Sequence, residues 1–262
     1  MEALLGAMER AQRAEQSAAS RGLLQRIDPR VKVAGLLALV AAVVFARNAL
    51  AMASILGFAI LAAIASRVKM KTLAAGAWLQ AVLFTSVIAT PALFLTPGDT
   101  VFSHPLLPGP VTAQGLTTAG YLLLRVVTAV TLAYLLVTTT PWPHVLKALR
   151  VFRVPAVVVL VLGMTYRYIL LLLETAREMF EAHRARAVAR VAGTEGAQQV
   201  AASAAVLFSK SMALSDEVYL AMQARGFRGE VHLLDDFRMT RLDWGAAILF
   251  AALAAATAWV GR

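Results

Sequence analysis

The sequence contains no cysteine and few charged residues: only 15% of its 262 residues are Asp, Glu, Lys or Arg. The lack of cysteine excludes disulfide scaffolds, thiol catalysis and zinc or iron–sulfur sites ligated by cysteine. Soluble domains carry about 25% charged residues, so this chain has too little polar surface to cover its apolar mass. With 60% hydrophobic residues and a mean hydropathy of +0.71, the composition predicts a membrane protein with several spans.

Carboxylates are distributed unevenly along the chain. Asp99 is the one carboxylate between Asp28 and Glu174, whereas residues 174–243 hold ten carboxylates and nine basic residues. This nearly neutral, water-compatible stretch separates a membrane block from one last apolar segment. We therefore predict four parts: a cytoplasmic N-terminal tail at 1–32, a membrane block of four helices at 33–138, a cytoplasmic or interfacial region of helices at 139–241 that contains the polar insert, and a C-terminal span at 242–262.

Five apolar segments are candidates to cross a bilayer, whose core needs about 20 helical residues. They lie at 33–46, 50–66, 73–95, 115–137 and 244–260, and Asp28 with Pro29 is typical of a helix start just before the first. Basic residues follow the second and fourth segments, while the loop at 96–113 has neither Lys nor Arg. The positive-inside rule then puts the N-terminus and the insert in the cytoplasm. The sequence predicts an all-α, polytopic membrane protein with about five crossings.

A sixth apolar run, at 155–173, does not fit this count. Basic residues precede it and the charged stretch at 174–243 follows it, so both of its ends are predicted on the cytoplasmic side. Arg167 in its middle disfavours free exposure to lipid, at a cost of about 3 kcal/mol on insertion scales. We expect this helix to lie obliquely against the other spans or against a partner subunit.

The composition of the polar insert predicts two surface helices. Each has an arginine flanked by small residues near its end or directly after it. The first runs from Glu174 towards Gly193 and contains Arg186, and the second spans about 195–224 and is followed by Arg225. Small residues allow a partner's backbone to approach, and a guanidinium can grip carboxylates or carbonyls with two parallel hydrogen bonds. The alternative is that both arginines are ordinary cations at helix C-termini, where the helix dipole favours them.

Little in the sequence indicates catalysis, a metal site or nucleic-acid binding. The histidines, His104, His144, His183 and His232, are scattered without ligand spacing, so we expect no metal on this chain. No H-E-x-x-H, G-x-S-x-G or P-loop motif occurs, so we expect no cofactor here and any ATP on partner subunits. The mixed charge of the insert argues against nucleic acid. Arg125, inside the fourth apolar segment, is either a functional charge or a structural donor to Thr or backbone carbonyls.

Several short motifs follow one another between about residues 22 and 245. They are IDPRVK at 27–32, TTP at 139–141, HVLKAL at 144–149 with VP at 154–155, YRYI at 166–169 followed by Glu174, ARA at 185–187 and ARG at 224–226. In this order they resemble the CbiQ/EcfT family, the transmembrane T components of energy-coupling factor (ECF) transporters. The first Ala-Arg-Gly signature departs from the family pattern because Ala187 stands in place of glycine.

The resemblance implies a subunit of an ABC-type importer in the cell inner membrane that joins two ATPase subunits to a substrate-binding S component. The implied ATPase-coupling residues are Ala185, Arg186, Ala187, Ala224, Arg225 and Gly226, which would insert into grooves on the two ATPases. The implied candidates for a structural or S-component contact are Arg167, Tyr168 and Glu174. The implied cargo is a transition-metal ion, cobalt first, carried by a CbiM-like S component with or without a small CbiN-like membrane protein.

Three alternatives stay open from the residues. The same subunit can serve nickel or a vitamin, since the cargo pocket is expected on another polypeptide. An intramembrane enzyme would need an acid–base pair at the membrane face, and Glu174, Glu178 and His183 are the cluster available for it. A membrane scaffold without transport is the third alternative, and purification with or without an ATPase separates it from the first.

Overall fold

The computed structural model describes residues 22–97, 99–102, 111–186, 194–228 and 239–260. Almost all residues in these ranges lie in helices, which confirms the predicted all-α class. The chain divides into two compact units. We call the described part of residues 15–145 and 237–262 the membrane unit, and the described part of residues 146–236 the insert unit.

Polar side chains begin the first long helices of the membrane unit. A short helix, α2 (Leu23–Arg26), leads to α3 (Pro29–Phe45), where Oδ1 of Asp28 accepts a hydrogen bond from the backbone N–H of Arg30 at 2.8 Å. Pro29 occupies the first helical position, where its missing N–H costs nothing. The predicted helix start is confirmed. Asn48 begins α4 (Ala49–Ala65) in the same way, by accepting from the N–H of Leu50 at 3.0 Å.

The third apolar segment changes helix type along its length. It consists of α5 (Met70–Thr72), the π-helix η1 (Leu73–Trp78) and α6 (Leu79–Leu95). The hydrophobic pattern did not predict a π-helix, because a segment that is apolar on all sides carries no periodicity that distinguishes helix types. Nε1 of Trp78 donates a hydrogen bond to Oγ1 of Thr131 on the neighbouring helix at 2.9 Å, which ties the end of η1 to that helix.

The predicted outer loop at 96–113 contains a small strand pair that was not predicted. β1 (Thr100–Phe102) pairs antiparallel with β2 (Val111–Thr112), and α7 (Ala113–Thr139) follows at once. Oγ1 of Thr112 accepts from the N–H of Gly115 at 3.0 Å and so caps α7. A Cβ at Gly115 would lie 2.8 Å from the carbonyl oxygens of Ala92 and Leu93, so glycine allows α7 to approach α6 closely.

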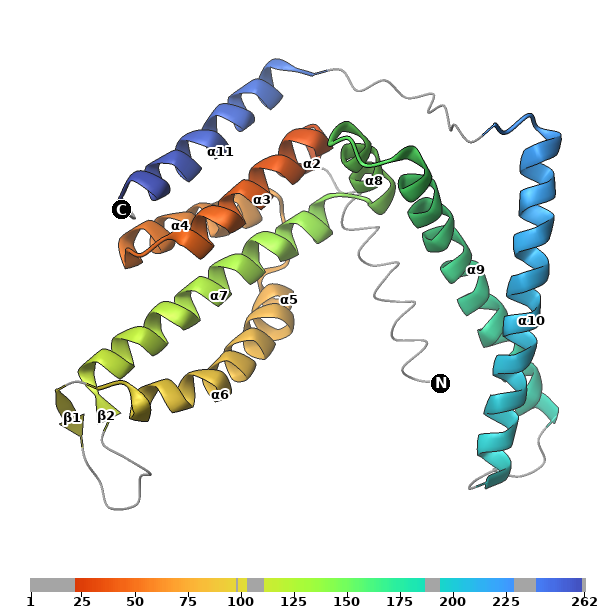
Figure 1. Cartoon of the computed structure of the whole chain (residues 1–262), viewed down its shortest axis with the longest axis horizontal. Helices are drawn as coiled ribbons and strands as arrows, with labels where there is room; N and C mark the ends of the chain where they lie inside the picture. Colours follow the sequence, from red (N-terminus) through yellow and green to blue (C-terminus); the bar gives the residue numbers. More distant parts are fainter. Residues whose placement is uncertain (1–21, 98, 103–110, 187–193, 229–238, 261–262) are drawn as a thin grey trace. The chain divides into compact units, whose positions relative to one another are not determined.

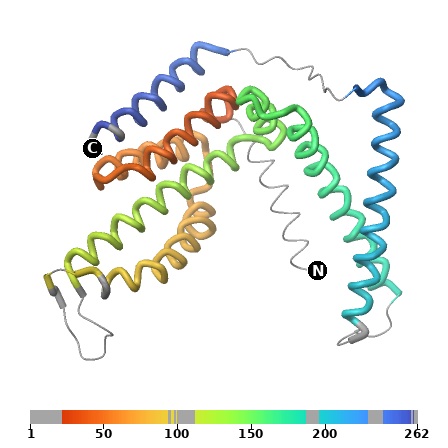
Figure 2. Tube along the Cα trace, viewed as in Figure 1, coloured from red at the N-terminus to blue at the C-terminus, as the bar shows by residue number. Residues whose placement is uncertain are grey.

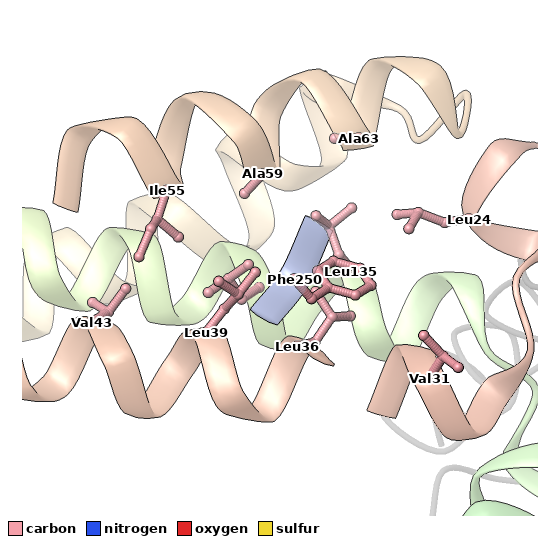
Figure 3. Packing of buried hydrophobic residues seen from close by; sticks show 11 residues of the cluster. Leu24, Val31, Leu36, Leu39, Val43, Ile55, Ala59, Ala63, Leu135 and Phe250 are labelled. Atoms are coloured by element: carbon pink, nitrogen blue, oxygen red, sulfur yellow. The ribbon is translucent and has the colours of Figure 1, made fainter. Parts of the chain in front are cut away.

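The core of the membrane unit lies between α3, α4, α7 and the C-terminal helix α11 (Arg241–Val260), as Figure 1 shows. Figure 2 shows that α3 and α11 run in the same direction while α7 runs in the opposite one. Apolar side chains from all four helices meet in the cluster of Figure 3. Its buried members are Leu24, Val31, Leu36, Leu39, Val43, Ile55, Ala59, Ala63, Leu132, Leu135 and Phe250.

The contact between α3 and α11 depends on one glycine. Gly35 is buried on α3, and a Cβ at this position would overlap the side chain of Phe250 on α11. The ring of Phe250 in turn packs edge-on against Phe58 of α4, with ring centroids 5.9 Å apart. Glycine at position 35 therefore lets an aromatic ring fill the space between three helices.

Arg125 has the structural role that was one of its two predicted alternatives. Its Nη2 donates a hydrogen bond at 2.8 Å to the carbonyl oxygen of Ala46, the residue that ends α3. The last carbonyls of a helix lack partners within the helix, and a cation there also meets the negative end of the helix dipole. Arg125 of α7 therefore caps the C-terminus of α3.

The insert unit consists of α8 (Trp142–Val151), α9 (Ala156–Arg186) and α10 (Thr194–Ala224), of which α8 begins within the membrane unit. The predicted break at Glu174 is wrong: the apolar run at 155–173 and the charged stretch after it form one continuous helix of 31 residues. Composition changes at Glu174, but no Gly or Pro interrupts the helix there. A Cβ at Gly163 of α9 would lie 3.4 Å from Cδ1 of Leu146, so α8 packs closely on α9.

Three stretches of the described residues are long and apolar enough, by length and composition, to cross a membrane. They are Met70–Leu93, Ala113–Thr139 and Ala156–Arg186. All five predicted apolar segments form helices, although α4, with 17 residues, is shorter than a typical span. In α9 no residue of the most apolar window is buried within the chain, so this surface is available to lipid or to a partner. The number of crossings stays a prediction.

Candidate functional site

Arg186 is the last described residue of α9 and its side chain is exposed. His183 and Arg184 stand in the same last turn, so the end of α9 carries several cations where the helix dipole favours them. Ala185 is also exposed, and Ala187 lies outside the described residues. The structure therefore places Arg186, the first candidate arginine, at an exposed helix end, next to the small residue Ala185.

Arg225 directly follows the last residue of α10 and is also exposed. Gly226 has a positive φ of 79°, and its N–H donates to the carbonyl of Gln223 at 2.9 Å. The N–H of Phe227 donates to the carbonyl of Met222 at 3.0 Å. This pair of hydrogen bonds is a Schellman motif, which needs the left-handed backbone that glycine adopts without strain. The Ala-Arg-Gly signature is therefore a helix end that presents arginine at the capping position.

The two arginines lie at opposite ends of a helix pair. α9 and α10 run in opposite directions, and Nζ of Lys210 on α10 contacts Oγ1 of Thr175 on α9 at 3.4 Å (Figure 1). Each helix has 31 residues, which at 1.5 Å per residue is about 46 Å. One small ligand does not span such a pair, so Arg186 and Arg225 suit two separate contact surfaces.

The other predicted site residues lie earlier on α9. Arg167 and Glu174 are both exposed, and seven residues of α-helix place them two turns apart on nearly the same face. Tyr168 is half-buried beside them. Glu178 and His183, which the enzyme alternative would need together with Glu174, are exposed as well.

The charged half of α9 has the features of a solvated helix face. Nε of Arg177 donates to Oε1 of Glu181 at 2.8 Å, an i,i+4 ion pair with both side chains about half exposed. The i,i+4 spacing of opposite charges on a helix favours such a pair. Within the described ranges, no group of three or more His, Asp or Glu side chains gathers in a way that could hold a metal ion.

Sequence reasoning missed a buried polar cluster at the start of α3. Lys32 stands in the basic motif that precedes the first apolar segment, yet its side chain is 1% exposed and its Nζ donates to the carbonyl oxygen of Thr139 at 3.0 Å. Asp243 was counted with the charged stretch at 174–243, yet it is 2% exposed and its Oδ1 accepts from the backbone N–H of Asp28 at 2.7 Å.

A sequence signal for Asp243 was present. Its Oδ2 accepts from both the backbone N–H and Oγ1 of Thr240 at 2.7 Å, so Thr240 and Asp243 form a capping-box pair at the start of α11. The pattern Thr-x-x-Asp before an apolar run predicts such a pair. No local pattern predicts that Asp243 also accepts from residue 28, because that contact joins positions 215 apart in the chain.

The chain is similar to transport proteins over most of its length. The profile of the CbiQ family, described as a cobalt transport protein, matches residues 20–233. An uncharacterized protein of Methanocaldococcus jannaschii is 31% identical over 215 residues, which cover 80% of this chain and 73% of that protein. The energy-coupling factor transporter transmembrane protein EcfT of Streptococcus thermophilus is 27% identical over 220 residues, covering 79% and 81%. The cobalt transport protein CbiQ of Rhodobacter capsulatus is 30% identical over 153 residues, covering 58% and 62%.

Proposed function

The chain belongs to the CbiQ family of cobalt transport proteins, and from this premise we propose that it is the transmembrane coupling subunit of an energy-coupling factor importer. In this role it joins two ABC-type ATPase subunits, which bind the ATP, to a substrate-binding S component in the cell membrane. The relatives with functional names are membrane components of transporters, so the expectation that this chain is not itself an enzyme is confirmed at the level of the family.

The observation that carries the proposal is the pair of exposed arginines at the two ends of α9 and α10. Two exposed arginines at opposite ends of one helix pair fit two ATPase subunits better than one small ligand. Each guanidinium presents five donors in a planar fork, which suits a groove lined by carboxylates or carbonyls. Closure of the ATPases on ATP then moves both helix ends at once. The insert unit transmits that motion through helices that are continuous for 31 residues.

The apolar surfaces of α9 and α10 are proposed to carry the S component. Val157, Val161 and Ile169 on α9 are exposed, as are Phe208 and Leu220 on α10. Apolar surface left open on a protein marks a contact with lipid or with another protein. Arg167, Tyr168 and Glu174 lie on the same helix and are proposed to contact the S component at the membrane face.

The cargo proposed is cobalt, with nickel and a vitamin as alternatives. The described residues supply no ligand cluster for a metal ion, and the proposal places the cargo on the S component. Cobalt is favoured by the description of the family and by the name of the Rhodobacter capsulatus relative. Uptake of labelled cobalt and nickel by the assembled complex distinguishes the metals from each other and from a vitamin.

The experiment that tests this role removes both arginines. The double variant Arg186→Ala/Arg225→Ala in the assembled complex is expected to insert normally but to lose ATPase association and uptake. Truncating one partner of a buried, hydrogen-bonded charge pair costs about 2–5 kcal/mol, so losing two such pairs releases the ATPases. Co-purification of the ATPases and uptake of labelled cobalt are the measurements.

A matched control removes an equal charge from neighbouring positions at the same two helix ends. The double variant Arg184→Ala/Arg228→Ala also loses two exposed guanidinium groups, but it leaves both signatures intact and should keep uptake and association. If the Arg186→Ala/Arg225→Ala variant retains both activities, or if the control loses them equally, the proposed coupling role of these arginines is wrong.

A further inference from the structure

The membrane unit holds its two connections to the insert unit at one place. The chain passes from the membrane unit into the insert unit shortly after α7 ends at Thr139, and it returns shortly before Thr240 begins α11. Figure 1 shows the end of α7 and the start of α11 at the same end of the membrane unit, on either side of the start of α3. The first turn of α3 therefore lies between the two points at which the chain leaves and re-enters the membrane unit.

That first turn contacts both connections directly. The backbone N–H of Asp28, at the start of α3, donates to Asp243, and Asp243 holds Thr240 with its other oxygen. At the end of the same turn, Nζ of Lys32 donates to the carbonyl oxygen of Thr139. We call these five residues, Asp28, Lys32, Thr139, Thr240 and Asp243, the α3 clasp.

Burial makes the hydrogen bonds within the α3 clasp costly to break. Thr139 is 1% exposed, as is Lys32, and Asp243 is 2% exposed, so water does not replace a lost hydrogen bond there without rearrangement. A buried charged group that loses its partner costs far more than an exposed one. The ammonium of Lys32 also sits at the negative end of α7, and the carboxylate of Asp243 at the positive ends of α3 and α11.

Among the described residues, a second cation also caps a helix end, but it lies away from the connections to the insert unit. Arg125 of α7 caps the end of α3 at Ala46, and Lys32 of α3 caps the end of α7 at Thr139. These two contacts hold the same antiparallel pair at its two ends. Only the contact made by Lys32 lies next to the connections to the insert unit.

We propose that Lys32 and Asp243 are positioning residues for energy coupling: the α3 clasp holds both attachment points of the insert unit at a fixed separation. With both points fixed, a displacement of α9 and α10 moves the S component and is not taken up by relative sliding of α7 and α11. This inference rests on the proposed coupling function and adds to it the place in the membrane unit that resists the motion.

The test measures both the separation and the coupling in the complete complex. Cysteines replace the exposed Pro143 and Met239, beside the two connections, and carry nitroxide labels; the chain has no other cysteine. In proteoliposomes with the unmodified α3 clasp, the distance distribution between the labels is expected to be narrow through ATP turnover. The variants Lys32→Met and Asp243→Asn are expected to broaden it and to lower cargo transported per ATP by severalfold, with the ATPases still bound.

Arg125→Met is the matched control, because it removes a cation that caps the same helix pair at the far end. It is expected to lower thermal stability while the label distances and the transport per ATP stay unchanged. Unchanged distances in the Lys32 and Asp243 variants, or an equal loss of coupling in Arg125→Met, would overturn the proposal. Failure of the coupling function itself shows separately, as retained ATPase binding in the Arg186→Ala/Arg225→Ala variant.

Discussion

At the scale of single residues, the membrane unit depends on positions where the available space or a hydrogen bond restricts which residue type fits. Gly35 is the clearest of these, because the side chain of Phe250 occupies the space that a Cβ would need. The new Cβ would lie 2.6 Å from Cγ of Phe250 and 3.0 Å from its Cβ, and rotation of the ring about the Cβ–Cγ bond moves neither atom. A methyl group at position 35 must therefore push α11 away from α3.

Gly35→Ala is expected to destabilise the protein by about 1–3 kcal/mol, the usual cost of overpacking a core. Thermal unfolding of the purified protein in detergent measures the effect. Gly57→Ala in α4 is the control, because nothing lies within 4 Å of a Cβ at Gly57 and alanine favours helix by about 1 kcal/mol over glycine. An unchanged or higher midpoint for Gly35→Ala would show that α3 and α11 do not pack as described.

The sequence predicted some of these residues and not others, for a physical reason. Asp28 was predicted as a helix cap because capping is decided by neighbours in the chain. The outcome for Arg125 was open between two alternatives, since its partner, Ala46, lies 79 positions away. The burial of Lys32 and Asp243 was not predicted at all, because each pairs across the bundle with a distant helix end.

At the scale of elements, the end of α10 that carries Arg225 has a local explanation. α10 ends where it was predicted to end, and the Schellman motif at Gly226 shows why the arginine is followed by glycine. The geometry of this motif fixes the backbone direction just after Arg225 and so fixes where its side chain begins. The corresponding turn after Arg186 lies outside the described residues.

Gly226→Ala is expected to weaken ATPase association, because an alanine in the left-handed region costs about 1–2 kcal/mol and shifts the helix end. Gly226→Asn should retain more association, since asparagine adopts this backbone more readily. Co-purification of the ATPases with each variant is the measurement. Equal association for the alanine and asparagine variants and the parent would mean that the left-handed backbone at Gly226 does not position Arg225.

Element types were harder to predict than element positions. Five apolar segments were predicted as helices and all five are helical, since apolar runs of that length have few other solutions in a membrane. The π-helix at 73–78 was not predicted because an apolar segment carries no periodicity that distinguishes helix types. The strand pair before α7 was not predicted because it joins residues that are separated along the chain. The continuity of α9 through Glu174 was missed because a change in polarity was interpreted as a helix end.

At the scale of the whole molecule, the membrane unit has two chemically different ends. One end gathers the α3 clasp, the end of α4 and the loop with Arg67 and Lys69, and the other carries the capped end of α3 and the strand pair. The basic loop residues favour the cytoplasm by the positive-inside rule. Both connections to the insert unit leave from the basic end, so the charge pattern and the proposed position of the ATPases agree.

The central claim is that α9 and α10 each end on an ATPase, and cross-linking tests it most directly. Because the chain has no cysteine, Ala185→Cys and Ala224→Cys each introduce a single reactive site next to a candidate arginine. Each carries a maleimide–benzophenone label, and the complete complex is irradiated in proteoliposomes. Asp99→Cys, before the strand pair, is the control.

We expect each labelled helix end to give an adduct of this chain with one ATPase subunit, and the doubly labelled chain to give an adduct with two. The control at position 99 should give none. Adducts of the labels at 185 and 224 with lipid alone, or no ATPase adduct at either position, would contradict the account.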